Sequence, residues 1–157
     1  MTRPLPVLLL AALCAGPAAA QPFVPADREA VELVRGRRTG GYVTVAATLA
    51  YAERASGGAF TLAGYRVERR PEDPFARVCI CYRLGVDPPT CGLGYRVAVN
   101  PVHVEPDDRY DGPGRDLEHG PRAFLRALAR EVSLQRQPEL LRRLRAALDP
   151  YDPYDWR

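Results

Sequence analysis

The chain has 157 residues, with 22 basic and 19 acidic side chains and a formal net charge of +3. All of these basic residues are arginines, and no motif gathers them into a known phosphate-binding pattern. A charge so close to balance excludes the strongly basic proteins that bind nucleic acid through charge alone. We therefore expect no nucleic-acid partner, and the absence of nucleotide-binding and zinc-protease motifs indicates no cofactor.

Residues 1–20 have the pattern of a secretory signal peptide. Arg3 precedes a short apolar run, and three alanines stand directly before Gln21. The run has roughly ten residues, about half of what a membrane-spanning helix needs. We expect cleavage before Gln21 and a periplasmic or secreted protein. A lipoprotein would instead be acylated at Cys14, but Leu13 occupies the position that requires a small residue.

The mature chain fits one domain, residues 21–148, followed by a short tail, residues 149–157. A first helix is predicted to be capped by Asp27 and to end near Gly36. A second helix is predicted over residues 45–55. Thr44 stands before it, and a pair of glycines ends it.

Three segments alternate apolar and polar residues with the period of two that is typical of strands, at residues 62–69, 76–84 and 91–99. Pro88 and Pro89 lack the backbone donor that a ladder needs, so a hairpin turn is expected there. Leu84 is then expected opposite Cys91. The predicted fold is α+β: the helix at residues 45–55 packs on a three-stranded antiparallel meander within residues 26–104.

Prolines and carboxylates predict an acidic loop at residues 105–118, followed by amphipathic helices within residues 121–148. The sequence leaves open whether these helices cover the second sheet face or the N-terminal helix. Their arginines would attract anionic lipid, but the acidic loop offers an internal partner of opposite charge. Binding to a membrane surface is therefore not expected.

Three cysteines remain in the mature chain: Cys79, Cys81 and Cys91. An odd number in an oxidising compartment predicts one disulfide and one further thiol. Cys79 and Cys81 point the same way from one strand, which disfavours a bridge between them. The Cys81–Cys91 pairing closes the shorter loop, but it needs a bulge near Cys91. Cys79 is either the alternative partner of Cys91 or a free thiol.

Two sets of residues are candidate metal ligands. Sulfur atoms of Cys79, Cys81 and Cys91, with an imidazole nitrogen of His103, form a donor set that suits zinc or cuprous copper. Their spacing matches no paired zinc motif, and oxidation to a disulfide competes with it.

The second set belongs to the acidic loop, which partly resembles a calcium-binding EF-hand loop. Asp107, Asp111 and Glu118 fall at the first, fifth and twelfth positions of that pattern. Arg109 stands at the third position, where an oxygen ligand belongs, so a solvated acidic loop is the alternative.

Catalytic groups are few, because the chain has only two histidines and two serines outside any nucleophile motif. Glu105 would flank His103 rather than face it. No catalytic residue is assigned. The predicted function is a secreted or periplasmic, non-catalytic binding or accessory module with a protein or peptide partner. The alternative is a thiol- or metal-handling protein that uses the three cysteines.

The tail repeats Asp-Pro-Tyr and ends in Trp156 and Arg157. Its prolines favour extended conformations and oppose a helix. Tyr151, Tyr154 and Trp156 are therefore expected to contact a partner's groove, and the alternative is that Trp156 folds back on the protein's own helices.

Overall fold

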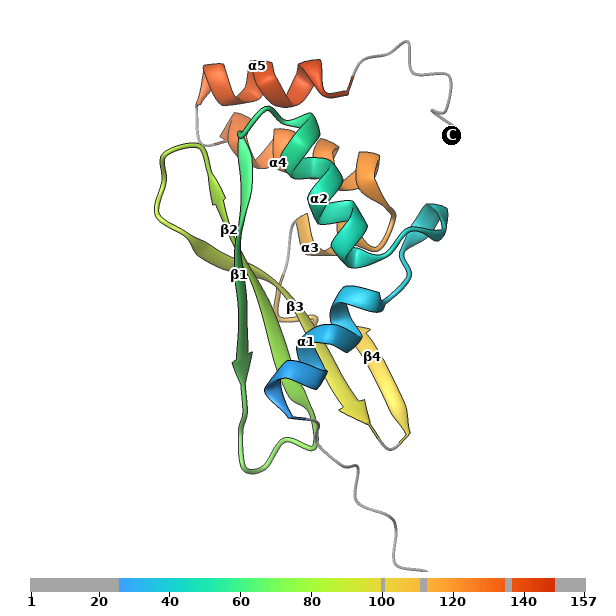
Figure 1. The fold of residues 1–157 in the computed structure, drawn as a ribbon. Coiled ribbons are helices and arrows are strands. Elements are labelled where there is room, and N and C mark those ends of the chain that lie inside the picture. The colour runs from blue at the N-terminus through green and yellow to red at the C-terminus, as the bar shows by residue number, and fades with distance from the viewer. Residues whose placement is uncertain (1–25, 100, 111–112, 135–136, 149–157) are drawn as a thin grey trace, which may run out of the picture.

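The computed structural model describes residues 26–99, 101–110, 113–134 and 137–148 (Figure 1). One antiparallel sheet has its four strands in chain order: β1 Phe60–Glu68, β2 Ala76–Leu84, β3 Thr90–Val99 and β4 Val102–Pro106. The helices are α1 Asp27–Gly36, α2 Val45–Ala55, α3 Pro113–Leu117, α4 Pro121–Leu134 and α5 Pro138–Ala146, with a 3-10 turn η1 at Gly40–Tyr42. The mixed helix-and-sheet class expected from the sequence is confirmed, but the sheet has one strand more than expected.

The fourth strand was missed because its first residues adjoin Pro101 and its last residues lie in the predicted acidic loop. Val97 pairs with Val104, which extends the apolar pattern of β3 by one more strand. The charge of Glu105 is compensated across the strands by Arg96, whose Nη1 donates to Oε1 at 2.8 Å. The loop prediction was also wrong for α3, which begins at Pro113, a residue suited to a helix start.

The inner face of the sheet is covered by helices (Figure 1). α1 contacts β1, β2 and β3, while α2 contacts β1 and α4. The buried inner rows of the two central strands are formed by Val78, Ile80, Tyr82, Leu93, Tyr95 and Val97. The cover is therefore wider than the single helix expected from the sequence.

α4 belongs to the same apolar core and not to the second sheet face. Its Phe124 meets Phe60 of β1 edge-on, with ring centroids 5.4 Å apart. α5 contacts α4 and has Leu144 fully buried. The sequence did not decide which surface the C-terminal helices cover. In the structure they cover the flank of α2 and the end of the inner sheet face.

The hairpin of β2 and β3 has a different register from the expected one. Tyr82 pairs with Thr90 and Cys81 with Cys91, whereas Leu84 pairs with Phe60 of β1. The pairing with β3 stops at Tyr82, and β2 ends at Leu84 because Gly85 has φ 58° and donates its N–H to the carbonyl of Ala59 at 2.9 Å.

Two bulges flank β2 at the level of Cys81. On one side Ile80 pairs with Leu93 and Cys81 with Cys91, so Gly92 is an extra residue of β3. On the other side Leu62 pairs with Tyr82 and Gly64 with Cys81, so one residue of β1 is extra as well. The φ of Gly64 is 138°, in the region that favours glycine. Such bulges bend strands and change which face their residues occupy.

The helix starts differ in their capping. Thr44 caps α2, because its hydroxyl accepts the N–H of Ala47 at 3.2 Å. The capping role expected for Asp27 was wrong: Ala26 is the N-cap residue, and Asp27 instead pairs with Arg69 at 2.8 Å.

Within the described part of the chain, no helix has the length and apolar character needed to cross a membrane.

Replacing Phe124 with Ala is expected to lower the free energy of unfolding by about 3–5 kcal/mol, because a fully buried ring is lost and a cavity remains. Urea denaturation measures this loss. Val86→Ala is the control, since Val86 is 99% exposed and the change should stay within about 0.5 kcal/mol. Similar losses in both variants would contradict the assigned core.

Candidate functional site

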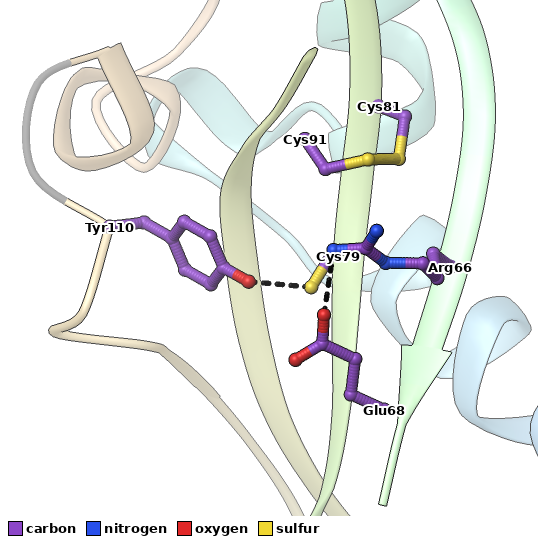
Figure 2. The surroundings of a disulfide bond; sticks show 6 residues. All are labelled: Arg66, Glu68, Cys79, Cys81, Cys91 and Tyr110. Carbon is purple, nitrogen blue, oxygen red and sulfur yellow. Dashed lines mark hydrogen bonds and ion pairs between the residues drawn. A yellow bond between two sulfur atoms is a disulfide. The ribbon is translucent and has the colours of Figure 1, made fainter.

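The sheet face opposite α1 and α2 carries the three cysteines (Figure 2). A disulfide joins Cys81 of β2 to Cys91 of β3, ten residues apart in the sequence. The Gly92 bulge places the two cysteines opposite each other, as this pairing required. Cys79 is a free, buried cysteine on the same face, two residues before the disulfide. The site is therefore a thiol beside a disulfide.

Tyr110 covers the thiol from the loop that follows β4. Its hydroxyl and the Cys79 sulfur form a hydrogen bond of 2.6 Å, and Figure 2 shows the ring reaching across β3. Gly94, which pairs with Cys79, leaves the space for the ring. A Cβ atom at Gly94 would stand 2.2 Å from the Cε2 atom of Tyr110, so no larger residue fits beneath this ring.

Asp107 holds this loop in place. Its N–H donates to the carbonyl of Gly94 at 2.9 Å, and its own carbonyl accepts the N–H of Tyr110 at 3.0 Å. Nη1 of Arg77 donates to its carboxylate at 2.6 Å, and Nη2 of Arg109 donates at 3.0 Å. Burial raises the pKa of the Asp107 carboxyl, but the hydrogen bonds from Arg109 and Arg77 outweigh it, so the pKa lies below its ordinary value. Asp107 is thus a charged anchor of the loop.

The electrostatics keep Cys79 protonated. Burial raises the pKa of its thiol, and the hydrogen bond with Tyr110 opposes this effect without cancelling it. Glu68 raises the pKa further, whereas Arg66 lowers it. In Figure 2 these two side chains of β1 pair beside the sulfur, with Arg66 Nη2 donating to Glu68 at 2.7 Å. Since the thiolate is the nucleophile and the metal ligand, the resting Cys79 is weakly reactive.

The proposed zinc or copper ligands do not come together. Cys81 and Cys91 are bonded to each other, and Cys79 is turned toward Tyr110. His103 pairs with Ala98, four residues along β3 from Gly94, which corresponds to about 13 Å. Its Nε2 lies 2.9 Å from Glu105, so these two side chains face each other, contrary to the sequence-based expectation.

The calcium candidates are also separated. Asp107 lies with Arg77 on the outer face, whereas the carboxylate of Glu118 accepts the hydroxyl of Tyr95 at 2.7 Å on the inner face. Asp111 lies outside the described residues. Within the described ranges, no three His, Cys, Asp or Glu side chains are grouped to hold a metal ion.

Glu118 instead belongs to a network that the sequence analysis missed. Arg37 donates from Nη2 to Glu118 at 2.7 Å and from Nη1 to the carbonyl of Val104 on β4. Burial, followed by the bond to Glu118, raises the pKa of Tyr95 far above its ordinary value. Arg37 and Glu118 are 81 residues apart, so no local pattern indicated this contact.

A groove of about 540 Å³ lies between α4 and α5. It is lined by Asp116, Ala123, Arg126, Ala129, Arg130, Leu141, Arg145 and Leu148. The repeat of arginines along α4 was visible in the sequence, but their position opposite α5 was not. Tyr151, Tyr154 and Trp156, the predicted partner contacts, lie outside the described residues.

No protein-family model, curated protein or solved structure matches this chain. Its geometry therefore has to carry the functional conclusion. The cysteine site offers a sheltered thiol and a structural bridge, and the groove offers a surface with both apolar and cationic groups.

Replacing Gly94 with Ala is expected to expose Cys79, because the added methyl group cannot coexist with the Tyr110 ring. Alkylation of the oxidised mature chain by iodoacetamide should become faster on the order of tenfold. Gly36→Ala is the matched control, since a Cβ there meets nothing within 4 Å. An unchanged alkylation rate in Gly94→Ala would show that Tyr110 does not shield the thiol.

The double replacement Cys81→Ala and Cys91→Ala is expected to lower the free energy of unfolding by about 2–3 kcal/mol, because a ten-residue loop is no longer closed in the unfolded chain. Urea denaturation with and without reductant measures it. Reductant should destabilise the parent protein by a similar amount and leave the double variant unchanged. If reductant has no effect on the parent protein, the bridge does not stabilise the fold.

Proposed function

We propose that this chain is a non-catalytic binding or accessory module of the periplasm or the extracellular space, with a protein or peptide ligand. The groove between α4 and α5 carries this proposal. Four apolar side chains, three arginines and one aspartate line it. Such a surface suits an acidic segment that also presents apolar or aromatic side chains.

The charges in the groove favour this ligand. Arg130 is compensated by Asp116, with Nη2 and Oδ2 2.9 Å apart. Among the described residues, the side chain of Arg145 has no hydrogen-bond or ion-pair partner. Guanidinium groups bind carboxylates through two parallel hydrogen bonds, which suits Asp or Glu side chains of a partner. Leu141 and Leu148 are only half-buried, so a ligand would also remove apolar surface from water.

The proposed compartment follows from the signal-peptide pattern of residues 1–20. The Cys81–Cys91 disulfide supports it, because disulfides persist mainly in oxidising environments. The groove mixes arginines with apolar side chains and an aspartate, whereas nucleic-acid phosphates need a more continuous cationic surface, so no nucleic-acid ligand is proposed.

Thiol handling is the second candidate function, supported by the position of Cys79 on the same strand face as the disulfide. Intact mass, free-thiol titration and metal analysis of one sample of mature protein decide between the two functions. One inert thiol without metal supports the binding module. A bound metal or three reactive thiols would favour a thiol- or metal-handling function.

Binding can be tested with fluorescein-labelled nine-residue peptides that alternate acidic and aromatic residues. We expect these peptides to bind the mature chain and their lysine-substituted counterparts not to bind. Arg145→Glu should weaken binding about tenfold or more, since an attractive contact becomes repulsive. Arg28→Glu is the control, because Arg28 is an exposed arginine of α1 that does not line the groove. Equal binding of acidic and basic peptides would contradict the proposal.

A further inference from the structure

We infer that two copies of this chain associate through β4, whose free edge pairs antiparallel with the same edge of a second copy. The strand order β1-β2-β3-β4 leaves β4 at one edge of the sheet, bonded to β3 alone. All five residues of β4 are described, and in Figure 1 no element of the described chain lies beyond this strand. This surface is separate from the groove between α4 and α5, so the inference goes beyond the proposed function.

Backbone contacts show which residues of β4 face the open edge. The N–H of Asp107 donates to the carbonyl of Gly94 at 2.9 Å, which continues the register of β3 and β4 by one pair. Residues bonded to a neighbouring strand alternate with residues that point away from it, so the backbone groups of Val102, Val104 and Pro106 face outward. Pro106 has no N–H, and at this position the ladder to β3 needs none.

The edge can accept a further strand at Val104. Arg37 of α1 donates from Nη1 to the Val104 carbonyl, which agrees with a carbonyl that points away from β3. A carbonyl oxygen has two lone pairs, so a second donor can be added beside this guanidinium. The opposite edge of the sheet is less suited to pairing, because the bulge between Leu62 and Gly64 interrupts β1.

The order of residues in β4 fits a two-fold axis through Val104, and this indicates a second copy of the chain as the partner. Antiparallel pairing about that axis sets each Val104 opposite its own copy, and the two residues exchange backbone hydrogen bonds. Each Val102 N–H then meets the carbonyl of Pro106 in the second copy. His103 lies opposite Glu105 of the second copy, so a nitrogen donor faces a carboxylate on both sides of the axis.

The carboxylate of Glu105 has room for this additional donor. Within one chain it already contacts His103, with Nε2 and Oε2 2.9 Å apart, and accepts Nη1 of Arg96 at 2.8 Å. An ionised carboxylate has about four acceptor positions, so the imidazole of the second copy can also bind. Donors and carboxylates directly opposite each other favour strand pairing, whereas like charges oppose it.

The inner side of the same edge is apolar and open. Val102 is 64% exposed, although it is a large apolar residue of the sheet. A groove of about 620 Å³ lies beside it between α1 and β4, and Leu33 and Val104 also line this groove. Val104 pairs with the buried Val97, so these side chains lie on the face that α1 covers. Pairing brings two such apolar strips together and removes them from water.

A dimer formed in this way leaves the groove between α4 and α5 accessible in each copy. α5 lies well away from β4 (Figure 1). A partner with two binding segments would then engage both copies and bind with higher avidity than a single segment.

Sedimentation velocity of the mature chain tests the inference. Between about 5 µM and about 500 µM we expect a shift from monomer to dimer, because a short strand gives a small interface of modest affinity. A chain that stays monomeric over this range would overturn the inference.

Two charge variants test whether β4 forms the interface. His103→Glu places two carboxylates on this strand, whereas His103→Arg combined with Glu105→Arg places two guanidinium groups there. Each variant alone should dimerise at least about tenfold more weakly, because like charges face each other across the axis. An equal mixture should form dimers again, since opposite charges then meet, and this recovery also shows that both variants are folded.

Thr61→Glu is the control, because Thr61 is an exposed residue of β1 at the opposite edge of the sheet. This change should leave dimerisation as it is in the parent protein. Dimers that persist in both charge variants would overturn the assignment to β4, as would a mixture that does not recover them.

Discussion

The two bulges beside β2 determine how both faces of the sheet are filled. In β1, Tyr65 and Val67 face the helices, and strict alternation would turn Phe60 outward. The extra residue before Gly64 reverses this order, and Phe60 enters the core and meets Phe124. In β3, the extra Gly92 moves Cys91 to the outer face, opposite Cys81. The two bulges beside Cys81 thus turn Phe60 into the core on one face and bring Cys91 opposite Cys81 on the other.

The packing of the outer face depends on a second constraint, which is the absence of a side chain at Gly94. Because Gly94 has no Cβ, the Tyr110 ring lies flat across β3 and reaches Cys79. The buried charge of Asp107, held by Arg77 and Arg109, keeps the backbone of this loop in register. The burial that results keeps the thiol neutral next to a disulfide. This arrangement protects the bridge from exchange as long as the loop stays in place, since exchange requires a thiolate.

Periodicity along the chain was sufficient to predict the helix over residues 45–55 and the strands at residues 76–84 and 91–99, because alternation and helix ends are local properties. The Cys81–Cys91 pairing was one of the alternatives that the sequence left open, and the bulge that it required is present at Gly92. β4 could not be predicted from composition, because the charge of Glu105 is compensated by Arg96 on the neighbouring strand. The contact of Arg37 with Glu118 and the groove between α4 and α5 depend on tertiary packing. The shift in alternation between Leu62 and Tyr65 was a visible signal of the β1 bulge.

The packing of α5 explains why a groove exists at all. Within the described chain, Leu144 is the one residue of this helix that is fully buried, while Leu141 is only half-buried. Leu141 and Leu148 therefore leave apolar surface in water beside the guanidinium of Arg145, which has no side-chain partner among the described residues. Arg130 of α4 is already compensated by Asp116, whereas the guanidinium of Arg145 on α5 is a group that a further carboxylate would neutralise. A segment that joins carboxylates to aromatic rings would neutralise this charge and cover the apolar surface, which is the combination that the proposed ligand offers.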